Sequence, residues 1–122
     1  MKKSGNGGQG SKWIRKDKRL SIYLRDSFSC AYCGRDLRGA EPCEVTLDHL
    51  LPRHYGGGNE ATNLITSCRS CNSSRQDKPW ADFAPGGAVD RIEQLRHTAL
   101  NLALARALIV GTAGDPELEA LR

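Results

Sequence analysis

Apolar and polar residues alternate along the chain in patterns that predict short helices and strands. Between about Ile14 and Asp26, apolar side chains form a single stripe through a basic sequence, the pattern of a helix with one buried face. From residue 44 to residue 50 the period is two, with Val45 and Leu47 on the side opposite Asp48. That period predicts a half-buried strand.

A second strand and a helix are predicted downstream of the first strand. Pro52 ends the first strand and leaves His49 at its end, where the side chain meets solvent. Residues 53–59 include three consecutive glycines and should form a flexible loop. A short return strand is expected at 64–67 and a helix at 69–76. The predicted fold class is therefore α+β, in the order strand, loop, strand, helix.

The last third of the chain is predicted to be helical. Trp80 and Phe83 should anchor it to the domain, and the Pro-Gly-Gly run at 85–87 should break it. Residues 89–110 read as one long helix closed by Gly111. The second half of that helix is apolar over more than one stripe, so we expect it to be buried against the core, a second copy or a partner protein. A short final helix is expected from residue 115.

Four cysteines have the spacing of a structural zinc site. Cys30 and Cys33 form one C-x2-C pair, and Cys68 and Cys71 form another after 34 intervening residues. Two such knuckles suit a tetrahedral zinc ion, and four thiolates leave that ion no open position for substrate. Cys43 has no partner at this spacing and is predicted to be a free, partly buried thiol.

The segment between the cysteine pairs carries a second set of candidate ligands. Asp48 and Asn72 are hard oxygen donors that suit magnesium, manganese or calcium, and His49 can exchange a proton near neutral pH. Asn72 directly follows Cys71, so zinc would fix the backbone that carries it. Alternatively, His49 is a core histidine satisfied by Asp48.

These motifs together resemble those of the HNH endonucleases, which have a ββα-metal (His-Me finger) fold. The resemblance covers Arg19 to about Lys78, roughly half of the chain, and rests on several elements in order. These elements are C-x-x-C-G at 30–34, D-H-x-x-P at 48–52, G-G in the loop, N-L at 63–64 and C-x-x-C-N at 68–72. A lone D-H or C-x-x-C would be weak, but the ordered combination is specific.

The resemblance implies roles for individual residues. His49 corresponds to the general base, and Asp48 and Asn72 to ligands of a catalytic Mg²⁺ or Mn²⁺ ion. Asn63 corresponds to the asparagine that braces the loop holding the histidine, so His49 and Asn63 are the predicted catalytic pair. The implied reaction is hydrolysis of DNA phosphodiester bonds, in one strand or both, to 5′-phosphate and 3′-hydroxyl ends. With no recognition helix or repeat in view, little sequence specificity is expected.

The positive charge of the chain is concentrated at its N-terminus. Eight of the eighteen Lys and Arg residues fall within residues 1–25, beside a single acidic residue, Asp17, and the net charge is +4. We interpret this stretch as an arm that attracts DNA; a solvated, solubilising tail is the alternative. Four further residues are candidate phosphate contacts. They are Arg53, His54, Arg75 and Lys78.

The length of 122 residues predicts one domain with a small core. Its expected parts are a disordered basic arm (1–12), an HNH nuclease domain (13–84) and a C-terminal helical extension (85–122). The sequence has no apolar run approaching ~18 residues and no apolar segment after its charged start, so we expect no membrane contact. The expected location is the cytoplasm of a bacterial or phage-infected cell, where thiols stay reduced and available to zinc.

Two other functions remain open from the sequence. A non-catalytic zinc-binding module could use the basic arm to hold nucleic acid, although it would need neither Asp48 nor His49 nor Asn72. An accessory subunit of a phage DNA-packaging complex could dock through the 89–110 helix, since some small members of the family resembled here serve beside a packaging motor.

Overall fold

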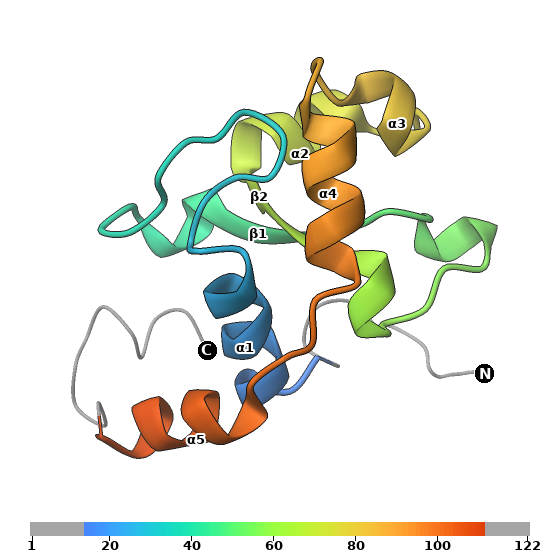
Figure 1. Cartoon of the computed structure of the whole chain (residues 1–122). Helices are drawn as coiled ribbons and strands as arrows, with labels where there is room; N and C mark the ends of the chain where they lie inside the picture. The colour runs from blue at the N-terminus through green and yellow to red at the C-terminus, as the bar shows by residue number, and fades with distance from the viewer. Residues whose placement is uncertain (1–13, 112–122) are drawn as a thin grey trace.

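The computed structural model of the chain describes residues 14–111. Figure 1 shows a central hairpin with helices on both sides of it. Three 3-10 turns, η2 (Pro42–Glu44), η3 (Arg53–Tyr55) and η4 (Ala61–Asn63), lie in the loops of this region. In chain order the helices and strands are α1 (Lys16–Arg25), β1 (Val45–His49), β2 (Leu64–Cys68), α2 (Arg69–Arg75), α3 (Trp80–Phe83), α4 (Ala88–Arg96) and α5 (Leu102–Gly111).

The hairpin and the helix after it form the predicted ββα unit. β1 and β2 pair antiparallel, with His49 opposite Leu64 and Asp48 opposite Ile65. Every residue of β2 is buried, because α1 packs on one side of it and α2 and α4 pack on the other (Figure 1). α2 begins directly after β2, so the hairpin fixes where α2 starts. The α+β class and the ββα-metal arrangement predicted from the sequence are confirmed.

The main core lies between the hairpin and the later helices. It is built around Tyr32, Leu37, Ile65 and Ile92, all nearly inaccessible to solvent. Trp80 and Phe83 of α3 pack against its edge, as expected for an anchor. A smaller cluster on the α1 side holds Ile14, Ile22 and Leu64. Both faces of the hairpin are therefore covered by apolar side chains.

The prediction of one long helix over 89–110 is wrong. The chain leaves helical geometry between residues 97 and 101, and α5 turns to lie against α1 (Figure 1). Asn101 begins α5 as a cap, since its Oδ1 accepts a hydrogen bond from Leu104 N at 2.9 Å. Thr98 Oγ1 donates to Gln94 O at 2.8 Å at the end of α4. These local side-chain bonds satisfy the backbone at both ends of the break.

α4 and α5 pack in different places. Ala88 and Ile92 of α4 belong to the same cluster as the hairpin, so the core continues past residue 84. In α5 the buried residue is Ala105, and Arg106 Nε lies 2.8 Å from Asp17 Oδ2 of α1.

The expected arm at 1–12 and the expected final helix from residue 115 lie outside the described residues. Within residues 14–111, no helix combines the length and the apolar character that crossing a membrane requires.

Candidate active site and metal centres

The four predicted zinc ligands meet at one point. The Sγ atoms of Cys30, Cys33, Cys68 and Cys71 all lie within 4.8 Å of one another, and the Cys33 and Cys68 sulfurs are 3.9 Å apart. A tetrahedral zinc ion with bonds of ~2.3 Å needs sulfurs ~3.8 Å apart. The N–H groups of Cys33 and Cys71 donate to the Cys30 and Cys68 sulfurs at 3.5 and 3.4 Å, respectively. The cluster fits a structural zinc ion in geometry and in donor type.

The neighbouring thiols of this cluster differ in how readily they ionise. Burial opposes ionisation of Cys30, but backbone N–H donors outweigh it and lower the pKa of this thiol to about 7. In contrast, burial and the neighbouring thiols raise the pKa values of Cys33 and Cys71. Four adjacent thiolates therefore need a positive ion among them. Cys43 is free and lies outside this cluster, but it is exposed rather than partly buried as predicted.

Tyr32 connects the zinc cluster to the candidate catalytic carboxylate. It stands between Cys30 and Cys33, and its hydroxyl donates a hydrogen bond to Asp48 Oδ2. Its ring packs edge-on against Phe83, with centroids 5.1 Å apart. The turn that holds two zinc ligands thereby also holds Asp48.

Arg75 occupies the other side of the Asp48 carboxylate. Its Nη1 donates to the two oxygens of Asp48 at 3.0 and 2.9 Å and to His49 O at 2.6 Å. Its Nη2 donates to Leu50 O at 2.6 Å, and its Nε to Lys78 O at 2.8 Å. With 1% of its surface exposed, Arg75 is an internal clamp on the end of β1, not the phosphate contact predicted.

Asp48 and Asn72 face the same region between β1 and α2. Asn72 Nδ2 donates to Thr46 Oγ1 at 2.9 Å, and Thr46 lies two residues before Asp48 on β1, hence on the same face. Burial raises the pKa of Asp48, while Tyr32 and Arg75 act against the shift. One carboxylate and one amide oxygen suit Mg²⁺ or Mn²⁺ in chemistry. Such an ion would share Asp48 with Tyr32 and Arg75.

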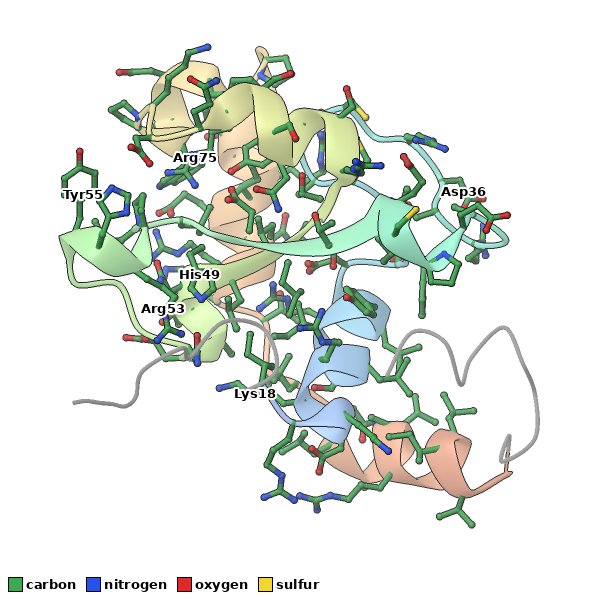
Figure 2. All side chains as sticks on the ribbon, turned by 180° about the vertical axis from the view of Figure 1, so that it is seen from behind. Lys18, Asp36, His49, Arg53, Tyr55 and Arg75 are labelled. Carbon is green, nitrogen blue, oxygen red and sulfur yellow. The ribbon has the colours of Figure 1, made fainter. Side chains whose placement is uncertain are left out.

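His49 lies on the opposite face of β1 (Figure 2). Its Nε2 is 2.7 Å from Asn59 Oδ1, and Arg53 Nη1 donates to that same oxygen at 3.3 Å. Because a guanidinium only donates, the shared atom must be an acceptor, and His49 Nε2 must carry hydrogen. In the neutral imidazole, Nδ1 is then left to accept a proton.

Asn59 was not among the site residues predicted from the sequence. It holds His49 and Arg53 through its side chain and accepts a hydrogen bond from Lys18 Nζ through its backbone oxygen. Figure 2 shows Lys18 and Arg53 on the same side of β1 as His49, with Arg75 on the other side. The sequence signal that could have identified Asn59 is its position directly after the glycine run, where it is the first polar residue past the flexible part of the loop.

Asn63 spans the loop that follows His49. Its Oδ1 accepts from Leu51 N at 2.8 Å, and its Nδ2 donates to Leu51 O at 3.1 Å and Gly58 O at 2.9 Å. Gly57 packs so closely here that a Cβ would stand 1.7 Å from Leu51 O. The glycine permits the close approach, and the Asn63 amide ties the loop in the way expected of a brace.

The other two candidate phosphate contacts, His54 and Lys78, have partners other than Asn59. His54 Nε2 is 3.4 Å from Asp77 Oδ2, and its ring lies against Tyr55 with centroids 4.3 Å apart. Lys78 Nζ donates to Ser74 O at 3.3 Å. Among the four residues predicted, Arg53 shares a hydrogen-bond partner with His49.

Comparisons with known proteins agree with this geometry. Residues 30–78 match the family model described as HNH endonuclease. The CRISPR-associated endonuclease Cas9 of Corynebacterium diphtheriae is 30% identical over 86 residues, which is 65% of this chain and 8% of that protein. The Cas9 of Actinomyces naeslundii is 37% identical over 67 residues, which is 54% of this chain and 6% of that protein. Solved structures offer no significant match.

The chain thus spans less than a tenth of the length of these two relatives. The segment that matches the family model contains both cysteine pairs and the whole ββα unit, and it contains the candidate residues Asp48, His49, Asn63 and Asn72. Residues 30–78 thus match the HNH endonuclease family in sequence, and the ββα unit and the four-cysteine cluster lie within the matched segment.

Proposed function

We propose that this protein is a metal-dependent endonuclease that hydrolyses DNA phosphodiester bonds and leaves 5′-phosphate and 3′-hydroxyl ends. One observation carries the proposal. His49, oriented by Asn59 with Nδ1 left to accept a proton, stands beside two cations and next in sequence to the buried carboxylate of Asp48. A base, an oxygen ligand and positive charge are the requirements of phosphodiester hydrolysis.

His49 acts as the general base in this proposal. It takes a proton at Nδ1 from the water that attacks phosphorus, while Nε2–H stays bonded to Asn59 Oδ1. Asn63 holds the loop that carries Asn59, through its bonds to Leu51 and Gly58. The ring therefore keeps one orientation and one tautomer before substrate arrives.

Asp48 and Asn72 are the ligands proposed for a Mg²⁺ or Mn²⁺ ion. When bound, that ion stabilises negative charge on the phosphate and on the departing 3′ oxygen. Tyr32 and Arg75 hold the Asp48 carboxylate in place before the ion arrives. The zinc ion proposed for the four cysteines has a structural role only.

The enzyme we propose has little specificity for DNA sequence. The cations beside His49 are Lys18 and Arg53, which suit phosphates, whereas base sequence is read by groups that reach base edges. The DNA would be met in the cytoplasm of a bacterial or phage-infected cell.

Incubation of supercoiled plasmid with the purified protein tests the proposal. We expect nicked or linear DNA with Mn²⁺ or Mg²⁺ added, none in a low concentration of chelator that leaves zinc bound, and none with His49→Ala. Plasmid that the wild type binds without cutting under all these metals would favour the non-catalytic binding module. Cutting by His49→Ala at the wild-type rate would remove His49 from the mechanism.

Self-association through α5 is part of the same proposal. Leu104 and Val110 are 45% and 78% exposed, although Ala105 of the same helix is buried near α1. Two copies joined here would bring two His49 sites to one duplex, and nicks could become double-strand breaks. Light scattering should give a mass above that of the monomer for the wild type and the monomer mass for Leu104→Glu. A monomeric wild type at micromolar concentration would leave α5 as a docking surface for another protein.

A further inference from the structure

Three N–H donors from separate parts of the chain converge on Asn59. Lys18 Nζ, from α1 and 41 residues earlier in the sequence, donates to its backbone oxygen. Arg53 Nη1, from η3, donates to its side-chain oxygen at 3.3 Å, and His49 Nε2 lies 2.7 Å from that oxygen. Two cations and the candidate catalytic imidazole thus surround the oxygens of one residue.

This arrangement has the chemistry of an anion site. A DNA phosphate presents several oxygens on one atom, and it can accept from a lysine and an arginine together. The present acceptors on Asn59 are neutral, whereas a phosphate oxygen is negatively charged and adds a direct Coulomb attraction to both cations. Phosphate oxygens would therefore compete well for the same donors. Glu60 is exposed and adjacent in sequence, but it is one negative charge beside two positive ones.

Among residues 14–111, no carboxylate pairs with the Lys18 side chain in a way that would explain its position. The acidic residue next to it, Asp17, turns its side chain to Arg106 at 2.8 Å and to Arg15 at 3.6 Å. The Lys18 side chain instead extends to the loop beside His49 (Figure 2). Fixing the Lys18 side chain beside the loop costs side-chain entropy. A bond to a substrate phosphate would offset that cost.

We infer that Lys18, together with Arg53, binds a phosphate of the DNA backbone beside His49. The inference rests on the proposed function for its substrate, and it adds a residue that lies outside the segment matched to the family, residues 30–78. Lys18 is a binding residue here, and Asn59 is the neutral group that fills its site in the absence of DNA.

The chain offers a matched control for this site. Lys16 is on the same helix with the same charge, but it is exposed. Binding of a fluorescent 20-base-pair duplex is measured by anisotropy for the wild type, Lys18→Met and Lys16→Met, with no Mg²⁺ or Mn²⁺ added, so that cutting does not interfere. Lys18→Met should weaken binding about tenfold more than Lys16→Met.

The salt dependence separates a phosphate contact from a structural tie to the loop. Losing one contact to duplex phosphate lowers the slope of log affinity against log salt by ~0.9, and we expect this loss for Lys18→Met, with Lys18→Arg close to the wild type. A slope for Lys18→Met equal to that of the wild type would overturn the inference and reduce Lys18 to a tie to Asn59. These results do not depend on cleavage. A wild type that never cuts plasmid would refute the proposed function and leave the binding contrast intact.

Discussion

Asp48 and His49 are neighbours in sequence, yet the two faces of β1 on which they lie are built differently. On the α2 face, the Asp48 carboxylate is buried and already bonded to Tyr32 and Arg75. On the α1 face, His49 is half-buried and is held by a surface loop through Asn59. The candidate metal ligand Asp48 is thus part of the core, whereas the candidate base His49 lies at its edge and is held by a loop.

Because of this difference in burial, we expect the two faces of β1 to contribute differently to folding and to activity. Substitutions on the α2 face should disturb folding as well as activity, because they leave buried charges or thiols without partners. Substitutions on the α1 face should alter activity with little effect on folding. Three variants test this contrast.

The largest effect is expected from Cys68→Ser. Cys68 ends β2, caps α2 and contributes one of the four sulfurs, so the variant should lose zinc and lower the melting temperature by more than about 10 °C. Zinc content by mass spectrometry and a thermal melt provide the measurement. The exposed Cys43 is the control residue, and Cys43→Ser should change neither quantity. One equivalent of zinc with an unchanged melt in Cys68→Ser would contradict the four-cysteine site.

A smaller effect is expected from Arg75→Met. This change leaves the Asp48 carboxylate buried without its guanidinium and should lower the free energy of unfolding by about 3–5 kcal/mol, as measured by urea denaturation. Arg69→Met, an exposed arginine on the same helix, should cost less than about 0.5 kcal/mol. The double variant Arg75→Met with Asp48→Asn should recover part of the loss, because no unpaired charge remains. Equal losses from Arg75→Met and Arg69→Met would show that the clamp does not stabilise the fold.

The smallest effect on stability is expected from His49→Ala. The side chain is half-buried and its Nε2 contact is to a loop asparagine, so the free energy of unfolding should change by about 1 kcal/mol or less. The same urea titration measures it. A loss as large as that of Arg75→Met would mean that both faces of β1 are equally structural and would remove the contrast.

The sequence predicted the hairpin, α2 and the zinc ligands because their signals are local. Alternation between 44 and 50 marks β1, and the spacing of the cysteine pairs marks the cluster. The Asp48–Arg75–Tyr32 group has no such signal, since its members are separated in sequence and meet only when the fold closes. A basic residue in the last turn of a short helix has the same sequence pattern whether it is exposed or buried. That ambiguity led to the mistaken role for Arg75.

The break between α4 and α5 escaped prediction for a related reason. Good helix formers run through the break, including Ala99 and Leu100. They are outweighed by the cap at Asn101 and by the packing of α5 on α1, which is a tertiary contact. The sequence pattern predicts that such a segment is helical, but it does not show the tertiary contact that decides where the helix breaks.

The return of α5 to α1 has a consequence for how this fold can be connected to other chains. The first and last helices of the described part lie together (Figure 1), and the Asp17–Arg106 ion pair joins them. Units whose entry and exit points are close can be inserted into a loop of a larger protein with little distortion of the host. In the two Cas9 relatives, the matched segment is likewise a small part of a much longer chain, 8% and 6% of it.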